Sequence, residues 1–114
     1  MSIGLFLVGS ELIQLCIGMH QIQMHFLNGV HIYIEGDFQH EHKGIAHIGG
    51  GRANLARQSI SLVSILHKVV RAVTTEGDRV LVLQFDDDEI VKIIDDSDQY
   101  ESFQIGSPKG LIIV

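Results

Sequence analysis

The stretch "MHQIQMHFLNGVHIYIEG", residues 19–36, decides the fold of this chain. Polar and apolar residues alternate from residue 20 to 26 and again from residue 30 to 35. Because successive side chains of a strand point to opposite faces, this alternation predicts two half-buried β-strands. The short link between them, Leu27-Asn28-Gly29, predicts that the two strands form a hairpin.

The length of the hairpin loop decides which residues face each other. A two-residue turn at Asn28-Gly29 would place Phe26 opposite His31 and mix polar and apolar residues on each face. A three-residue loop places Phe26 opposite Val30 and keeps both faces uniform. We therefore predict the three-residue loop, with Gly29 in a left-handed conformation. The core face then carries Ile22, Met24, Phe26, Val30, Ile32 and Ile34.

The opposite face of this hairpin is polar without being highly charged. Glutamine, histidine and tyrosine solubilise a surface less than lysine or glutamate do, so they suit a face that is covered part of the time. The face is therefore either a binding surface for another subunit or a ligand, or the ordinary solvated side of a sheet. The binding-face candidates are Gln21, Gln23, His25, His31 and Tyr33.

The hairpin has a second copy further along the chain. The segment "IQMHFLNGVHIYI", residues 22–34, aligns without a gap with "LVLQFDDDEIVKI", residues 81–93. Phe26 then matches Phe85, and the apolar positions on either side match as well. Such self-similarity predicts two copies of one structural unit, each with a buried phenylalanine before its loop.

The match continues upstream of both hairpins. Residues 7–17 align with residues 65–75, one residue out of step, and the extra residue falls in the next turn. Each copy is therefore a meander in which one strand precedes the hairpin. Asp88 takes the place of Gly29 in the second copy, so its turn geometry is expected to differ.

The segment between the copies predicts a loop and one helix. The sequence "FQHEHKGIAHIGGGR", residues 38–52, is rich in glycine and histidine and has no sustained period. Apolar residues at helical spacing follow, with Asn54 as the N-cap, so we expect a helix from about Asn54 to Leu66. A strand should begin at about Lys68. The helical stripe consists of Leu55, Ala56, Ile60, Leu62, Val63, Leu66 and Val69.

These elements predict an α+β, mainly β fold in a single domain, residues 1–114. We expect two strand-hairpin meander repeats packed as a small sandwich or open barrel, with one helix between them. Repeat one spans about residues 3–38, the loop and helix about 39–67, and repeat two about 68–114. Residues 106–110 predict a turn between two short strands near the end of the chain.

Composition excludes several classes of protein. Hydrophobic residues make up 46% of the chain, which argues against intrinsic disorder. No apolar run is long enough to span a bilayer, and the first residues lack the basic region of a signal peptide. The single cysteine, Cys16, rules out an internal disulfide. We therefore expect a cytoplasmic protein with no membrane partner.

Acidic residues gather in the second half of the chain. The formal net charge is −6, and ten of the fourteen acidic residues lie between residues 76 and 101. An acidic surface repels phosphate backbones, so we expect no nucleic-acid partner. The acidic residues either form solvated turns that keep the protein soluble or suit a basic protein partner or a cation. The loop Asp86, Asp87 and Asp88 joins the binding-face candidates. A second cluster, residues 95–98, should lie ~17–20 Å away, at the far end of the same hairpin.

Metal binding and catalysis find little support in the sequence. His40, His42 and His47 are weak metal candidates, because soft divalent metals bind histidines but this spacing matches no zinc signature. His25 and His31 face each other across the hairpin and form a second pair. No serine lies in a nucleophile elbow, and no spacing builds an acid–base pair. We therefore expect no cofactor, no bound metal and no catalytic residue.

Two segments resemble a known family: "LVGSELIQLCIGMHQIQMHFLNGVHIYIEG", residues 7–36, and "YESFQI", residues 100–105. They are similar to small bacterial proteins of unestablished function that pair a Gly-x-x-(x)-aliphatic-x-Gln strand with a Leu-x-Phe-x-x-Gly hairpin and end in a Tyr-Glu-x-aromatic stretch. The resemblance implies a bacterial cytoplasmic protein and supplies no catalytic residues. The matching positions are Gly9, Gln14, Phe26, Gly29, Tyr100, Glu101 and Phe103.

Some small acidic proteins similar to this family act as immunity proteins or antitoxins. We therefore expect a non-enzymatic binding protein, most simply a protein–protein interaction module of immunity or antitoxin type. One alternative is a small-ligand-binding domain with a pocket between the repeats, and a weaker one is a metal-dependent enzyme. Self-association through the polar face or a sheet edge would make the protein a homo-oligomer.

Overall fold

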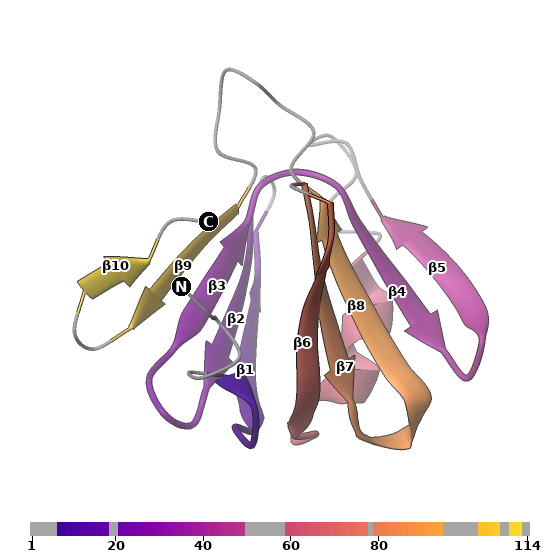
Figure 1. The fold of residues 1–114 in the computed structure, drawn as a ribbon, viewed down its shortest axis with the longest axis horizontal. Helices are drawn as coiled ribbons and strands as arrows, with labels where there is room; N and C mark the ends of the chain where they lie inside the picture. Colours follow the sequence, from indigo (N-terminus) through magenta and orange to yellow (C-terminus); the bar gives the residue numbers. More distant parts are fainter. Residues whose placement is uncertain are drawn as a thin grey trace.

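The structure is a computed structural model that describes residues 7–18, 21–49, 59–77, 79–94, 103–107 and 110–112. Over these residues the protein is mainly β, with ten strands arranged as two five-stranded antiparallel sheets. The two sheets face each other and splay apart toward their outer strands (Figure 1). They remain separate sheets and do not close into a barrel.

Sheet one has the strand order β1-β2-β3-β9-β10, and sheet two has the order β5-β4-β8-β7-β6. The strands of sheet one are β1 (Leu12–Ile17), β2 (Ile22–Phe26), β3 (His31–Ile34), β9 (Phe103–Ser107) and β10 (Gly110–Ile112). The strands of sheet two are β4 (Phe38–His42), β5 (Ile45–Gly49), β6 (Val70–Glu76), β7 (Val80–Phe85) and β8 (Glu89–Ile94).

The first hairpin has the predicted three-residue loop. Met24 lies opposite Ile32 and His25 lies opposite His31, so the predicted register is confirmed. The backbone N–H of Phe26 donates to the carbonyl of Val30 at 2.9 Å, and Gly29 has a φ of 90°. Glycine adopts this left-handed conformation without the steric cost that a Cβ would impose.

The two halves of the chain exchange hairpins. The first half places β1, β2 and β3 in sheet one and β4 and β5 in sheet two, whereas the second half places β6, β7 and β8 in sheet two and β9 and β10 in sheet one. Strand orders in the two sheets are therefore equivalent under exchange of the halves. Each sheet consists of a three-stranded meander from one half and a hairpin from the other.

The expectation of a loop after residue 38 is wrong, because residues 38–49 form the β4–β5 hairpin. Phe38 and His40 alternate with outward residues on β4, and a buried histidine does not register as an apolar residue in a period count. The two turn residues, Lys43 and Gly44, both have positive φ, which is the geometry of a tight two-residue hairpin turn. The turn expected within residues 106–110 does join two short strands, β9 and β10.

A crossing of the two halves lies where β1 and β6 begin. Glu11 and Val69 form an isolated antiparallel bridge, and four backbone hydrogen bonds surround it. The four bonds form two equivalent pairs, because residues of the two halves that are 58 positions apart, such as Leu12 and Val70 or Gly9 and His67, exchange roles within each pair. The four bonds are Leu12 N–H to Lys68 O at 3.0 Å, Val70 N–H to Ser10 O at 3.0 Å, Gly9 N–H to Val70 O at 2.8 Å and His67 N–H to Leu12 O at 2.7 Å.

Both strands that leave this crossing carry an irregularity at the same place. The register of β1 against β2 shifts between Leu12 and Gln14, and that of β6 against β7 shifts between Val70 and Ala72. The upstream alignment of the two copies, one residue out of step with the hairpins, is therefore confirmed by strand pairing.

The predicted helix is not shown in the described residues. Ser59–Ile65 form a 3-10 helix, η2, while the earlier part of the expected helix lies outside the described range. Serine and β-branched residues dominate this segment and favour an α-helix only weakly. A three-residue period buries Leu62 and Ile65 together and leaves Val63 half-exposed, whereas the predicted stripe had included Val63 and omitted Ile65.

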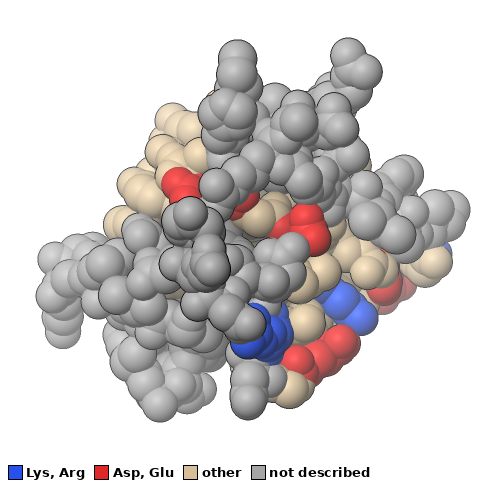
Figure 2. Space-filling model, turned by 90° about the horizontal axis from the view of Figure 1, so that it is seen from above, with Lys and Arg blue, Asp and Glu red and all other residues tan. Residues whose placement is uncertain are grey.

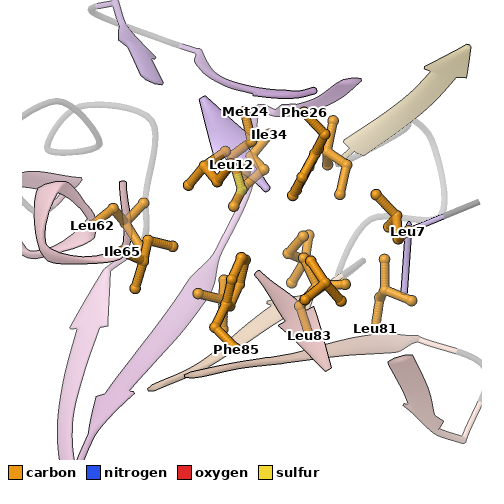
Figure 3. Packing of buried hydrophobic residues seen from close by; sticks show 14 of the residues in the cluster. Leu7, Leu12, Met24, Phe26, Ile34, Leu62, Ile65, Leu81, Leu83 and Phe85 are labelled. Carbon is orange, nitrogen blue, oxygen red and sulfur yellow. The ribbon is translucent and has the colours of Figure 1, made fainter. Parts of the chain in front are cut away.

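Apolar side chains from both sheets fill the space between them (Figure 3). Phe26 and Phe85 are the counterparts that the repeat predicted, and both are buried. Their rings stack across the interface, with centroids 6.5 Å apart and planes inclined by 13°. Leu7 and Ile65, a further pair related by the repeat, are also buried in this core.

We expect Phe26→Ala to lower the free energy of unfolding by roughly 3–5 kcal/mol, because it removes a buried ring from the centre of the core. Leu27→Ala is the matched control, since Leu27 is 68% exposed in the adjoining loop. Urea denaturation followed by circular dichroism measures both. An unfolding midpoint for Phe26→Ala equal to that of the wild type would show that the register is wrong.

Candidate functional site

The two halves of the protein differ chemically at one buried position. Residues 22–34 correspond to residues 81–93, so Val30 corresponds to Glu89. Both face the core and both are buried, Val30 at 2% and Glu89 at 0% exposure. A fully buried glutamate is uncommon unless it is paired, so this departure from the repeat marks a candidate site.

The neighbouring strand departs from the repeat in the same way. In sheet one, Ile32 pairs with Ile105 on β9, whereas in sheet two its counterpart Val91 pairs with His40 on β4. His40 is 1% exposed and Ile105 is buried, so a buried isoleucine in one sheet is replaced by a buried histidine in the other. We call Glu89, His40, His42 and Ser64 the Glu89 cluster.

Both carboxylate oxygens of Glu89 have partners. Oε1 is hydrogen-bonded to Nδ1 of His42 and lies 3.3 Å from Nε2 of His40. Oε2 accepts from the hydroxyl of Ser64 on η2 at 2.9 Å, and Nζ of Lys68 lies 4.0 Å away. Because an ionised carboxylate only accepts, both imidazoles present an N–H to it.

His40 connects Glu89 to the 3-10 helix. Its Nδ1 lies 3.0 Å from the hydroxyl of Ser61, while its Nε2 faces Glu89. A ring with a proton on Nε2 donates to the carboxylate, and the serine hydroxyl can partner Nδ1 whether or not that nitrogen also carries a proton. Three elements, β4, β8 and η2, are therefore joined at the end of the core by polar side chains.

Glu89 remains ionised despite its burial. Burial raises its pKa, but the hydrogen bonds from His42 and Ser64, together with the charge and hydrogen bond of His40, outweigh that effect and hold the pKa below its ordinary value. The carboxylate is therefore a fixed negative charge at the end of the core, between β4, β8 and η2. It orients whatever imidazole binds to it.

The predicted binding face lies on the outer side of sheet one, and its side chains form a connected row. The amide of Gln21 donates to Glu35 at 3.1 Å, and the amide of Gln23 donates to Gln21 at 2.7 Å. Nε2 of His25 lies 3.0 Å from Oε1 of Gln23. The row therefore holds the glutamines in defined orientations rather than as freely rotating chains.

Aromatic rings extend this row onto β3. His31 and Tyr33 stack with ring centroids 4.6 Å apart, and His25 lies 5.9 Å from His31. Burial and then the charge of His31 lower the pKa of His25, so this ring is neutral at physiological pH. The His31 ring lies so close over Gly106 of β9 that a Cβ there would collide with it.

The acidic loop is less open than its sequence suggests. Asp86 forms an ion pair with Arg71 and accepts from the backbone of Val69, and the Arg71 hydrogen bond is the main reason that its pKa lies below the ordinary value. Asp87 pairs with Lys68 at 3.0 Å. Two of the three predicted carboxylates thus already have basic partners, whereas Asp88 is exposed and has no ion pair within the described residues.

Charges are also mixed at the opposite end of the molecule. On the face in Figure 2, described Lys and Arg side chains lie beside Asp and Glu side chains, so the acidic residues do not form one continuous patch there. Lys92 and Glu76, for example, pair at 2.9 Å. The second predicted acidic cluster, residues 95–98, lies outside the described residues, so its distance from the first stays a prediction.

The weak metal candidates are only partly brought together. His40 and His42 lie on the same side of β4, as predicted, and the backbone of His47 pairs with His40. In the described parts of the chain no group of three or more His, Cys, Asp and Glu residues is arranged to hold a metal ion. Glu89 occupies Nδ1 of His42 instead.

The sequence contained a signal for Glu89 that composition concealed. Composition places Glu89 in the acidic segment, where solvated turns are expected, yet the repeat alignment sets it against Val30, a predicted core residue. A charged residue at a core position of a repeat indicates a partnered, buried group. Ser61 and Ser64 give no such signal, because both lie outside the aligned hairpins and outside the predicted apolar stripe.

No protein family, curated protein or solved structure matches this chain in comparisons with known proteins. The resemblance to small bacterial proteins therefore stays a prediction. Within the described residues, no helix is long and apolar enough to cross a membrane.

We expect that Glu89 and His40 of sheet two can be replaced by the residues at the equivalent positions of sheet one, which are Val30 and Ile105. Glu89→Val and His40→Ile should each lower the free energy of unfolding by about 1–3 kcal/mol, because each removes one hydrogen-bonding partner of the other buried group. The double variant should be about as stable as the wild type or more so, since apolar residues often replace a buried polar pair without loss. Thermal denaturation of all four proteins tests this, and additive losses in the double variant would contradict it.

Glu89 should also contribute a pH-dependent part of the stability. Its folded pKa lies below the ordinary 4.5, so the contribution is complete above pH 4.5 and is lost as the pH falls through the folded pKa. We expect the stability difference between the wild type and Glu89→Gln to shrink as the pH falls below 4.5 and through the folded pKa. Urea titrations at several pH values measure it, and a difference independent of pH would show that Glu89 is not ionised in the fold.

Proposed function

We propose that this protein is a non-enzymatic binding protein of immunity or antitoxin type, which engages a protein partner through the outer face of sheet one. The observation that carries the proposal is the connected row of Gln21, Gln23, His25, His31 and Tyr33. Such side chains offer donors, acceptors and ring surfaces to a partner. Their mutual contacts already hold them in place.

Preorganisation supports binding by this face. Ordering a flexible side chain at an interface costs about 0.5–1.5 kcal/mol, and the contacts between Gln23, His25 and the rings of β3 remove part of that cost before a partner arrives. Tyrosine is enriched at protein interfaces and lysine is depleted. Among the described outward-facing residues of β1, β2 and β3, none is lysine or arginine.

Charge favours a basic partner over nucleic acid. The formal net charge of −6 attracts a basic surface over a distance and repels a phosphate backbone. Glu35, at the end of the row, adds one negative charge to the face itself. The loop of Asp86 to Asp88 contributes less than its composition suggests, because Arg71 and Lys68 partly neutralise it.

Self-association is a second candidate, supported by the edge strand β1. Ile13 and Ile17 on this strand are 42% and 41% exposed, and β1 is bonded to β2 on one side only in the described sheet. An apolar edge strand of this kind is a template for pairing with another chain. A small-ligand pocket between the repeats lacks comparable support, since the described space there holds packed apolar side chains.

The test compares two matched double variants as bait in lysate of the host. Gln23→Ala with Tyr33→Ala alters the row, and Gln39→Ala with Gln84→Ala alters the outer face of sheet two. We expect a partner retained by the wild type to lose at least about tenfold in affinity for the first variant, because central aromatic contacts carry most binding energy. The second variant should bind it as the wild type does.

Sedimentation of the purified proteins at micromolar concentration separates the two candidates. A dimer that is lost in the Gln23→Ala and Tyr33→Ala variant would identify the partner as a second copy of this chain. A wild type that stays monomeric at high concentration would exclude self-association. Equal binding of both variants to every retained protein would contradict the assignment of the face.

A further inference from the structure

One histidine of the Glu89 cluster has an outward ring nitrogen. Nδ1 of His42 is hydrogen-bonded to the buried carboxylate, and the side chain is 42% exposed. Its Nε2 is on the opposite side of the ring and has no partner in the part of the chain that the structure describes. Glu89 therefore fixes the tautomer with the proton on Nδ1, which leaves the lone pair of Nε2 available.

A second histidine–glutamate pair provides an internal comparison. Nδ1 of His67 lies 3.2 Å from Oε2 of Glu11, but His67 is 76% exposed and Glu11 is 36% exposed. Water competes for that carboxylate and screens its charge, so it orients the imidazole only weakly. Glu89 is fully buried and holds His42 without such competition.

From this arrangement the geometry points to His42 as a reactive site, at which Nε2 accepts an acyl group from a neutral carbonyl compound. The lone pair of Nε2 bonds to the carbonyl carbon, and the bond from that carbon to the leaving oxygen breaks with its electron pair. The leaving alkoxide takes a proton from water, and the carboxylate of Glu89 balances the positive charge of the acylated ring. The hydroxide that this proton transfer leaves then attacks the carbonyl carbon, and the bond to Nε2 breaks with its electron pair, which releases the acid and restores neutral His42.

A neutral acyl compound fits this end of the molecule better than an anionic phosphoryl donor. Lys43 follows His42 and is bonded through its backbone to Asp88, and residues 86–89 are linked in turn to Lys68 and Arg71. The charged side chains of these connected segments are Lys43, Lys68 and Arg71 against Asp86, Asp87, Asp88 and Glu89. Three basic groups therefore stand against four acidic ones, and the remaining negative charge repels an anion. The inference adds a reaction that the proposed binding function does not include, and it stands on other residues. Binding by the outer face of sheet one and acylation of His42 can therefore each fail alone.

Diethyl pyrocarbonate, a neutral acylating reagent, tests the site directly. Peptide mass spectrometry after short exposures gives the rate at which each histidine is acylated in the folded, full-length protein. We expect His42 to react about tenfold faster than His67, although His67 is more exposed, because an oriented carboxylate raises the nucleophilicity of the ring. Glu89→Gln should remove that advantage and leave the rate at His67 unchanged.

Glu11→Gln is the matched control, and it should change neither rate by more than the error. Nitrogen-15 chemical shifts of the wild type above neutral pH give a second readout that needs no variant. We expect them to show His42 with the proton on Nδ1. A proton on Nε2, or a His42 that reacts no faster than His67 in the wild type, would overturn the proposal.

Discussion

The two halves of the chain are joined where residues 10–12 lie beside residues 68–70. Each half donates backbone hydrogen bonds to the other there, and the bonds in the two directions are equivalent. The bridge between Glu11 and Val69 lies at the centre of this arrangement. Because β1 and β6 leave it in different sheets, the crossing sets the two meanders face to face. The stack of Phe26 on Phe85 and the burial of both core faces follow from that placement.

The near-symmetry set by this crossing makes the exception at Glu89 informative. Two halves with the same strand order and the same irregularity after the crossing have the same packing problem at their core ends. Sheet one solves it with Val30 and Ile105, which need no partners. Sheet two places an ionised carboxylate there and surrounds it with His40, His42 and Ser64. Since the apolar solution exists in the same molecule, packing alone does not account for the polar one.

The sequence predicted the hairpin register, the repeat and the core phenylalanines because each depends on local alternation, which the pleat reads directly. It did not predict the β4–β5 hairpin, since His40 is a buried residue with a polar side chain and its burial depends on Glu89, 49 positions away. It also missed that β9, besides pairing with β10, pairs with β3 of the other half of the chain. Such pairings are set by the crossing, which leaves no periodic trace in the sequence.

Of the candidate site, the outer row of sheet one could be predicted and the Glu89 cluster could not. Alternation along the strand places Gln23 and His25 on one face, and this does not depend on which other segments pack nearby. The cluster instead needs three segments to converge, and one of them, η2, had been assigned to an α-helix with a different period. Asp86 and Asp87 show the same limit, because only the structure reveals Lys68 and Arg71 beside them.

The exchange of hairpins also has a consequence for synthesis of the chain. All strands of sheet two lie between residues 38 and 94, so this sheet can form as soon as that stretch has left the ribosome. Sheet one instead needs β9 beside β3, so Ile32 can pair with Ile105 only after residues near the end of the chain have been synthesised. Until then β3 has an open edge, which invites pairing with other nascent chains. A chain truncated before β9 would therefore contain all strands of sheet two but leave the edge of β3 in sheet one unpaired and prone to aggregation.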